Sequence, residues 1–328
     1  MSERKNPDHL IQALKKQYTI STDWTGSLFF GLHIQWEYTL RTCNISISDY
    51  IKEALHKFQH PKPPRPQNAP HAWKAPTYGA KIKYAGDGDQ LPLFPPKSIH
   101  LVQQIVGTLP HYSVAVDTTM LVALGKLSSQ QYKATKQTYD ATMWLLNYAN
   151  SNPNATICYT ASDMNIYVHS NASYLSAPLS QSRACVHYFL SNSSPDPTQP
   201  PKTRPRFNGP IHTVSKIVSN VMGSAAKDKI GATYINGQKA VPIRTLLREL
   251  GNPQPATPMQ VDNSTAVGFS NDTIRQRQSK AINMHFYWIR DRTSRGQFLV
   301  YWQQGITNLA YYHTKKYSPA HHCLMQSK

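Results

Sequence analysis

The stretch that decides the fold is Ser170-Asn171-Ala172-Ser173-Tyr174-Leu175. It lies in the part of the chain where the sequence pattern has changed from that of helices to that of strands. After Pro153, residues typical of strands replace the three- and four-residue spacing typical of helices. We expect strands over 155–159, 165–170, 184–190, 211–217, 259–261 and 298–302, and helices over 224–234, 241–250 and 273–292 and near Asn308. Antiparallel strands, a helix, a parallel strand and further helices predict a mixed α/β sheet.

The half of the chain before Pro153 is expected to be mainly helical. A strand over 27–36 should pair with a strand over 40–45, and Ser46 or Ser48 can cap the helix that follows. Prolines crowd residues 60–96, where their locked backbone and missing donor exclude a long regular element. The remaining helices are expected over 9–18, 50–58, 98–108, 117–127 and 134–150.

Length and composition indicate a folded protein without a membrane span. The 328 residues suffice for two domains, and 40% of them are hydrophobic. No apolar run approaches the roughly 20 residues that cross a bilayer, and the polar N-terminus carries no secretory signal. We therefore expect an intracellular protein, in the cytoplasm or the nucleus. The four cysteines are far apart in sequence, which favours free thiols over disulfides or a zinc site.

The net charge of +18, from 35 Lys and Arg against 17 Asp and Glu, is the strongest compositional signal. Such a balance favours a polyanionic partner, since contacts between basic side chains and phosphates release counterions and give affinity independent of sequence. The alternative is a solvated basic surface without a nucleic-acid partner.

Five short motifs occur in an order that resembles the C-terminal part of a copia-type retrotransposon Pol polyprotein. They are Gly31-Leu32, Ala115-Val116-Asp117, Ser182-Arg183, Val261-Asp262-Asn263-Ser264 and Gly305-Ile306-Thr307-Asn308-Leu309-Ala310. The resemblance implies the end of a reverse transcriptase palm and its thumb over 1–59, a Pro-rich connection over 60–96 and a helical connection over 97–153. It also implies a ribonuclease H-like domain with a mixed five-stranded sheet over 154–316, and a tail over 317–328. No Asp-Asp dipeptide occurs, so the metal site of the polymerase is expected to be absent.

The resemblance also implies where the acidic residues of ribonuclease H should lie. That enzyme holds two divalent cations roughly 4 Å apart, with carboxylate ligands. The corresponding positions here are Asn171, Lys227 or Lys229, Asp262 and Tyr311, of which only Asp262 is an acid. Asp228 cannot simply stand in for the glutamate that is missing at Lys227 or Lys229, because one step along a helix turns the side chain by about 100°. We expect Lys227 or Lys229 to form an ion pair with Asp262 where the metals would bind.

These observations lead us to expect a catalytically inactive protein that binds an RNA:DNA hybrid or duplex without sequence preference and needs no cofactor. The basic residues expected to contact nucleic acid are Arg275, Arg277, Lys280, Arg290, Arg292 and Arg295. Trp302 and Tyr287 could add an aromatic surface, although we favour core packing for both. One alternative is a residual hybrid ribonuclease in which Asp262 recruits Mg²⁺ or Mn²⁺ with Asp163 or Asp228. Another is a scaffold for an unknown protein partner.

Overall fold

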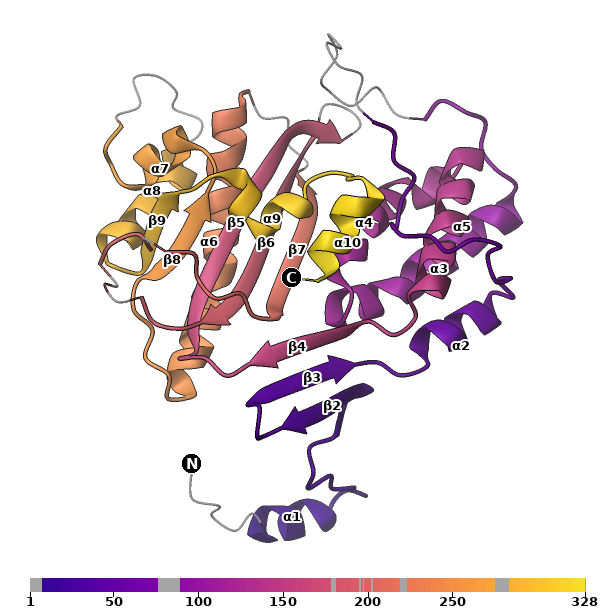
Figure 1. Ribbon diagram of the computed structural model, residues 1–328, viewed down its shortest axis with the longest axis horizontal. Coiled ribbons are helices and arrows are strands. Elements are labelled where there is room, and N and C mark those ends of the chain that lie inside the picture. The colour runs from indigo at the N-terminus through magenta and orange to yellow at the C-terminus, as the bar shows by residue number, and fades with distance from the viewer. Residues whose placement is uncertain are drawn as a thin grey trace.

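The residues that the structure describes form two β-sheets, with helices packed beside and on the larger one. Its structure, a computed structural model, describes residues 8–75, 89–177, 181–194, 196, 198–201, 203–218, 223–274 and 283–327. In Figure 1 a five-stranded sheet stands beside the helices α3 (Pro96–Ala115), α4 (Leu121–Gln130) and α5 (Lys136–Ser151), and a smaller sheet lies below both. Among the described helices, none is both long and apolar enough to cross a bilayer.

The larger sheet confirms the predicted mixed α/β fold. Its strands are β5 (Asn165–Ala177), β6 (Gln181–Ser191), β7 (Pro210–Val218), β8 (Thr257–Val261) and β9 (Phe298–Trp302), in the order β7-β6-β5-β8-β9. The hairpin strands β5, β6 and β7 pair antiparallel, whereas β8 pairs parallel with both β5 and β9. Strand β5 runs well past Ser170, so Asn171 lies within the strand and pairs with Cys185.

Helices cover both faces of this sheet. Alternate residues of β5 and β6 face α6 (Ala225–Glu249) and form an apolar core with it, including Val168, Val186 and Ile230. On the opposite face, Tyr167 and Phe189 stack with ring centroids 5.7 Å apart and pack against the short helix α9 (Leu309–Tyr312). Helix α9 and the last helix, α10 (Pro319–Gln326), lie between the sheet and the α3–α5 group (Figure 1).

Helix α6 is continuous, so the predicted break between residues 234 and 241 is wrong. The Asn236-Gly237 pair and Pro242 are poor helix formers, but tertiary packing overrides their propensity. Asn236 is buried and donates to Ser170 Oγ at 2.8 Å. A Cβ atom on Gly237 would lie 3.1 Å from Ile289 and 3.2 Å from Trp288, so the glycine permits close contact with helix α8 (Asn283–Ser294).

The smaller sheet contains the predicted hairpin and one strand from later in the sequence. Its strands, in order, are β1 (Leu28–Phe29), β2 (Leu32–Glu37), β3 (Thr42–Ser46) and β4 (Thr156–Thr160). The sequence predicts that the strand after Pro153 belongs to the domain over 154–316. It pairs instead with β3, where Ile45 faces Ile157, so this strand joins the N-terminal part.

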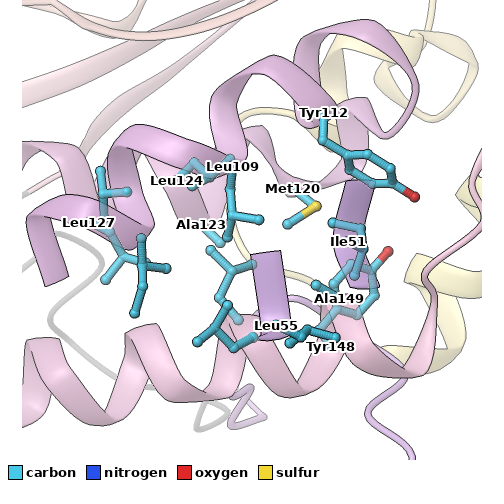
Figure 2. Close-up of a cluster of buried hydrophobic side chains, with 14 of the residues drawn as sticks. Ile51, Leu55, Leu109, Tyr112, Met120, Ala123, Leu124, Leu127, Tyr148 and Ala149 are labelled. Carbon is cyan, nitrogen blue, oxygen red and sulfur yellow. The ribbon is translucent and has the colours of Figure 1, made fainter. Parts of the chain in front are cut away.

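The N-terminal part has its own apolar core, centred between α3, α4, α5 and the short helix α2 (Tyr50–Lys57). Figure 2 shows Ile51 and Leu55 of α2 among side chains of the three longer helices. At the edge of this core, the Tyr112 hydroxyl donates to Pro153 O at 3.0 Å and accepts from Ala155 N at 2.9 Å. These two bonds fix the entry to β4.

Three predictions about helix ends need correction. Residue Asp49, in a left-handed conformation and without a side-chain cap, precedes α2, so neither Ser46 nor Ser48 caps it. The expected basic helix over 273–292 is represented by α8, because α7 (Ser264–Ser270) ends earlier and residues 275–282 are outside the described ranges.

The expected tail contains α10, whose His322 is buried and contacts the Tyr148 hydroxyl at 3.0 Å. The remaining described helices are α1 (Asp8–Lys15) and the 3₁₀ turns Thr118–Met120, Gln131–Lys133 and Gly305–Thr307.

Candidate functional site

Asp262 lies at the carboxyl end of β8, one residue beyond the last strand pair. That pair joins Val261 to Trp302 of β9, and Gln303 N donates to Val261 O at 3.2 Å. The next residue, Asn263, caps α7 by accepting from Ala266 N at 2.9 Å. Strand end and helix cap therefore hold Asp262 between them. Its side chain is 16% exposed.

Asn171 comes to this position from the middle of β5 and is fully buried. Its Oδ1 accepts a hydrogen bond from Ala172 N at 2.7 Å. Its Nδ2 is buried with no hydrogen-bond partner among the described residues. A buried donor without an acceptor costs roughly 1–3 kcal/mol. The environment therefore suits a group that only accepts hydrogen bonds, such as a carboxylate, better than it suits an amide.

Lys229, on the first turns of α6, joins these two side chains. Its Nζ lies 2.5 Å from Asp262 Oδ1 and also donates to Asn171 Oδ1. The Lys229 side chain is 14% exposed, so the ion pair is largely shielded from water. The expected ion pair is thus present, and Lys229 rather than Lys227 forms it. Lys227 makes no ion pair with a described residue. Its side chain lies near Gly223, just before α6, where a Cβ atom would be 3.9 Å from the Lys227 Nζ.

Tyr311 is brought beside Asp262 by the turn that precedes it. Asn308 caps α9 and donates from Nδ2 to Ser170 O at 3.1 Å and to Gln260 O at 3.4 Å. These bonds tie the start of α9 to the two strands that carry Asn171 and Asp262. A Cβ atom on Gly305 would lie 3.3 Å from Asp262 and 3.5 Å from the Tyr311 ring, so the glycine leaves room for both.

A second lysine adds positive charge at this point. Lys315 donates to the Tyr311 hydroxyl at 3.1 Å and lies 4.9 Å from the centre of its ring. Burial alone would raise the pKa of Tyr311, but the Lys315 ammonium outweighs that effect and lowers it. One ammonium group, that of Lys229, thus pairs with Asp262, and a second, that of Lys315, lies on the neighbouring Tyr311. We call Asn171, Lys229, Asp262, Tyr311 and Lys315 the Asp262 cluster.

Neither of the other acids considered at first joins Asp262. Asp163 is exposed and lies just before β5, where it accepts from Ser193 N, just after β6, at 2.8 Å. Asp228 is 1% exposed, and burial raises its pKa to about 6, against the weaker opposing effects of Ser182 and Lys229. Within the described ranges, no three His, Cys, Asp or Glu side chains are placed to hold a metal ion.

The Asp262 cluster does not fit the two divalent cations that the resemblance implies. Hard cations need several anionic oxygen ligands, and the cluster offers one carboxylate. The oxygen atoms of Asp262 and Asn171 are both engaged by the Lys229 ammonium. A lysine at this distance repels a dication and occupies the volume that the ion would need.

The structure describes half of the six basic residues expected to contact nucleic acid, and each has a partner within the chain. Arg290 pairs with Asp272 at 2.8 Å, Arg295 pairs with Asp291 at 2.8 Å, and Arg292 donates to Gln297 at 3.1 Å. Arg275, Arg277 and Lys280 lie outside the described residues.

Both aromatic residues for which we favoured core packing are exposed. Tyr287 is 60% exposed and Trp302 is 52% exposed. Trp302 ends β9 beside Val261, so its indole lies on the surface next to the strand end that carries Asp262. The preference for core packing was therefore wrong for these two side chains.

Sequence reasoning missed the buried polar groups on the α9 face of the sheet. His169 accepts from Leu309 N at 2.9 Å, and His187 and His313 stack with ring centroids 6.2 Å apart. Burial lowers the pKa of all three histidines, so they are neutral parts of the packing. Alternation within β5 and β6 could have indicated that His169 and His187 face inward.

Comparison with known proteins gives one distant sequence relative. The chain is 21% identical over 285 residues to the Retrovirus-related Pol polyprotein from transposon TNT 1-94 of Nicotiana tabacum, a match that covers 85% of this chain and 19% of that protein. The chain thus spans about a fifth of that relative's length. No protein-family model matches the chain.

Two solved structures share partial similarity with the protein. The N-terminal RNase H domain of a Mycobacterium tuberculosis protein, solved as a fusion with maltose-binding protein, matches 44% of this chain and 86% of its own, with 8% identity and a TM-score of 0.29. The protease-reverse transcriptase of prototype foamy virus matches 50% of this chain and 20% of its own, with 13% identity and a TM-score of 0.27. The sequence match is to a retrotransposon Pol polyprotein, and it is a distant similarity.

Proposed function

We propose that this chain is a catalytically inactive, nucleic-acid-binding remnant of a retrotransposon reverse transcriptase and ribonuclease H. The observation that carries the proposal is the Lys229–Asp262 ion pair, 2.5 Å long, with Asn171 as a second acceptor. In this interpretation Asn171, Lys229 and Tyr311 stand at the positions of three lost acids, and Asp262 is the retained one. We further place the start of the ribonuclease H-like part at β5, because β4 belongs to the N-terminal sheet.

The inactivity follows from charge. Hydrolysis of a phosphodiester by two metals needs one cation to activate water and another to stabilise the leaving oxygen. Lys229 supplies a single fixed positive charge that satisfies Asp262, and an ammonium cannot lower the pKa of a bound water as a dication does. A cation that entered would have to break the ion pair and would still face one carboxylate.

The same charges favour phosphate binding. Lys229 places one ammonium group on Asp262 and Lys315 places a second on the Tyr311 hydroxyl, in a chain whose net charge is +18. The exposed Trp302 pairs with Val261, the residue before Asp262, and in this proposal its indole offers a face for a base or sugar. We propose that a hybrid or duplex lies across this surface through sequence-independent phosphate contacts, to which Arg275, Arg277, Lys280, Arg290, Arg292 and Arg295 contribute.

A cleavage and retention assay with a labelled RNA:DNA hybrid tests both parts. The unaltered chain should retain the hybrid on a filter at low salt and leave it intact in Mg²⁺ or Mn²⁺. A variant with Asn171→Asp, Lys227→Glu, Lys229→Glu and Tyr311→Asp is the matched comparison, since it restores the acids that the resemblance implies. Cleavage by the unaltered chain that is lost in Asp262→Asn would establish a residual ribonuclease and contradict the proposal. Absence of retention at about 50 mM salt would remove the binding role and favour a protein scaffold.

A further inference from the structure

A second site lies in the N-terminal part, away from the Asp262 cluster. A cavity of about 240 Å³ opens between α4, α5, the segment 70–72 and Lys316. Its lining combines apolar side chains, including Leu127 and Trp144, with Lys126, Lys316 and His71. The indole of Trp144 is fixed, because its Nε1 donates to Ala69 O at 3.0 Å.

The charges that line this cavity do not balance. Neither Lys126 nor Lys316 forms an ion pair within the part of the chain that the structure describes. The only acid on the cavity lining is Asp140, which is 58% exposed at its side chain and pairs with Lys136 at 3.2 Å. Partial burial, together with the charge of Lys126, lowers the pKa of Lys316 to about 8. The two ammonium groups are thus close enough to repel each other, and an anion between them would relieve the repulsion.

His71 adds a buried donor to the same cavity. The residue is 6% exposed, and burial lowers its pKa to about 4, so the ring is neutral. His71 Nε2 lies 3.2 Å from Tyr317 N and 3.3 Å from Tyr317 O, so it accepts from the N–H when the ring proton is on Nδ1 and donates to the carbonyl when the proton is on Nε2. In the first tautomer, which the site proposed below requires, Nδ1 carries the proton. His71 Nδ1 is buried and has no hydrogen-bond partner among the described residues. A buried N–H without an acceptor normally finds one, in protein, solvent or ligand.

We propose that this cavity binds the phosphate group of a small phosphomonoester, held by Lys126, Lys316 and His71, with an apolar or planar portion of the ligand against Trp144. A phosphomonoester fits better than a monocarboxylate, because two ammonium groups and an N–H supply more donors and more positive charge than one carboxylate can use. The volume accommodates a phosphate and a small attached group, and it is below the usual range for whole drug-sized ligands. The site shares no residue with the Asp262 cluster, so it stands or falls independently of the proposed nucleic-acid-binding function.

Titration calorimetry on the full chain tests the proposal with inorganic phosphate, a nucleoside 5′-monophosphate and the corresponding nucleoside. We expect the first two to bind and the nucleoside to fail. Lys126→Met and Lys316→Met should each weaken phosphate binding about tenfold or more, as expected for a lost charge-assisted contact. Lys133→Met is the matched control: Lys133 is exposed, lies between α4 and α5 and does not line the cavity. It should change the affinity by less than about twofold.

The outcomes separate the sources of the phosphate. If an RNA:DNA hybrid competes with inorganic phosphate at the cavity, the phosphate group belongs to a nucleic acid, whereas an unaffected titration assigns it to a free small molecule. Equal loss of affinity in Lys133→Met and in the two cavity variants would mean general surface charge and would overturn the site. No heat of binding for phosphate or the monophosphate up to about 10 mM would overturn it as well, because a phosphate engaged by two ammonium groups should bind more tightly than that. Circular dichroism spectra that match the unaltered chain establish that the variants are folded.

Discussion

Replacing Lys229 with methionine removes the charge at the centre of the Asp262 cluster and keeps most of the side-chain volume. In the unaltered chain the ammonium lies 2.5 Å from Asp262, and the two side chains are 14% and 16% exposed. Breaking a fully buried ion pair on one side costs about 3–5 kcal/mol, whereas an exposed pair contributes about 0–1 kcal/mol. Because this pair is mostly but not fully buried, we expect Lys229→Met to lower the free energy of unfolding by about 2–4 kcal/mol at pH 7.

Urea denaturation followed by circular dichroism measures this change, and two controls make it specific. Lys227→Met should cost less than about 0.5 kcal/mol, because Lys227 has no ion-pair partner among the described residues. In a double-mutant cycle, Asp262→Asn should remove most of the cost of Lys229→Met, since no unpaired charge then remains.

A Lys229→Met variant within about 0.5 kcal/mol of the unaltered chain at pH 7 would refute the reasoning, as would a double variant with Asp262→Asn that keeps the full cost.

Further predictions concern Asp228, Asn308 and the basic surface. Burial raises the pKa of Asp228 from 3.8 to about 6, so the folded state binds more protons than the unfolded state between those values and stability falls as pH rises through them. Asp228→Asn should therefore stabilise the protein by roughly 1–3 kcal/mol at pH 8 and by little at pH 4, which thermal unfolding at both pH values measures; equal effects at the two would contradict the assignment. Asn308→Ala removes the cap of α9 and two donors to strand carbonyls and should cost about 2–3 kcal/mol in urea, against less than about 0.5 kcal/mol for the exposed Lys133→Met. Hybrid affinity, measured by fluorescence anisotropy, should fall at least about tenfold between 50 and 200 mM salt, and a flat response would exclude phosphate contacts as its source.

Much of the fold could be predicted because its strands have strong local patterns. The β-branched and aromatic residues of 211–217 and 298–302 identify strands β7 and β9, and β9 has the predicted limits. The break expected within α6 shows where local reasoning fails. Asn236 and Gly237 have low helix propensity, which predicts a break. In the structure the buried Asn236 amide bonds Ser170, and Gly237 permits the close approach of α8.

The candidate site was predictable only in part. The motif order indicated the ion pair with Asp262, but the choice between Lys227 and Lys229 depends on the rotation of α6 about its axis, which sequence spacing fixes only to within a residue or two. The pairing of the exposed Trp302 with Val261 is a tertiary contact between β9 and β8, whereas Lys315 lies only four residues after Tyr311. The pairing of β4 with β3 is likewise a long-range contact that no local pattern encodes.

In the proposed function, the Lys229 ammonium keeps divalent cations away from Asp262. Electron paramagnetic resonance of Mn²⁺ measures this directly, since bound Mn²⁺ loses the sharp signal of the free ion. We predict that the unaltered chain leaves Mn²⁺ free at concentrations up to about 1 mM, because one paired carboxylate is too weak a site. A stoichiometric loss of signal that Asp262→Asn abolishes would show that a cation binds there despite Lys229.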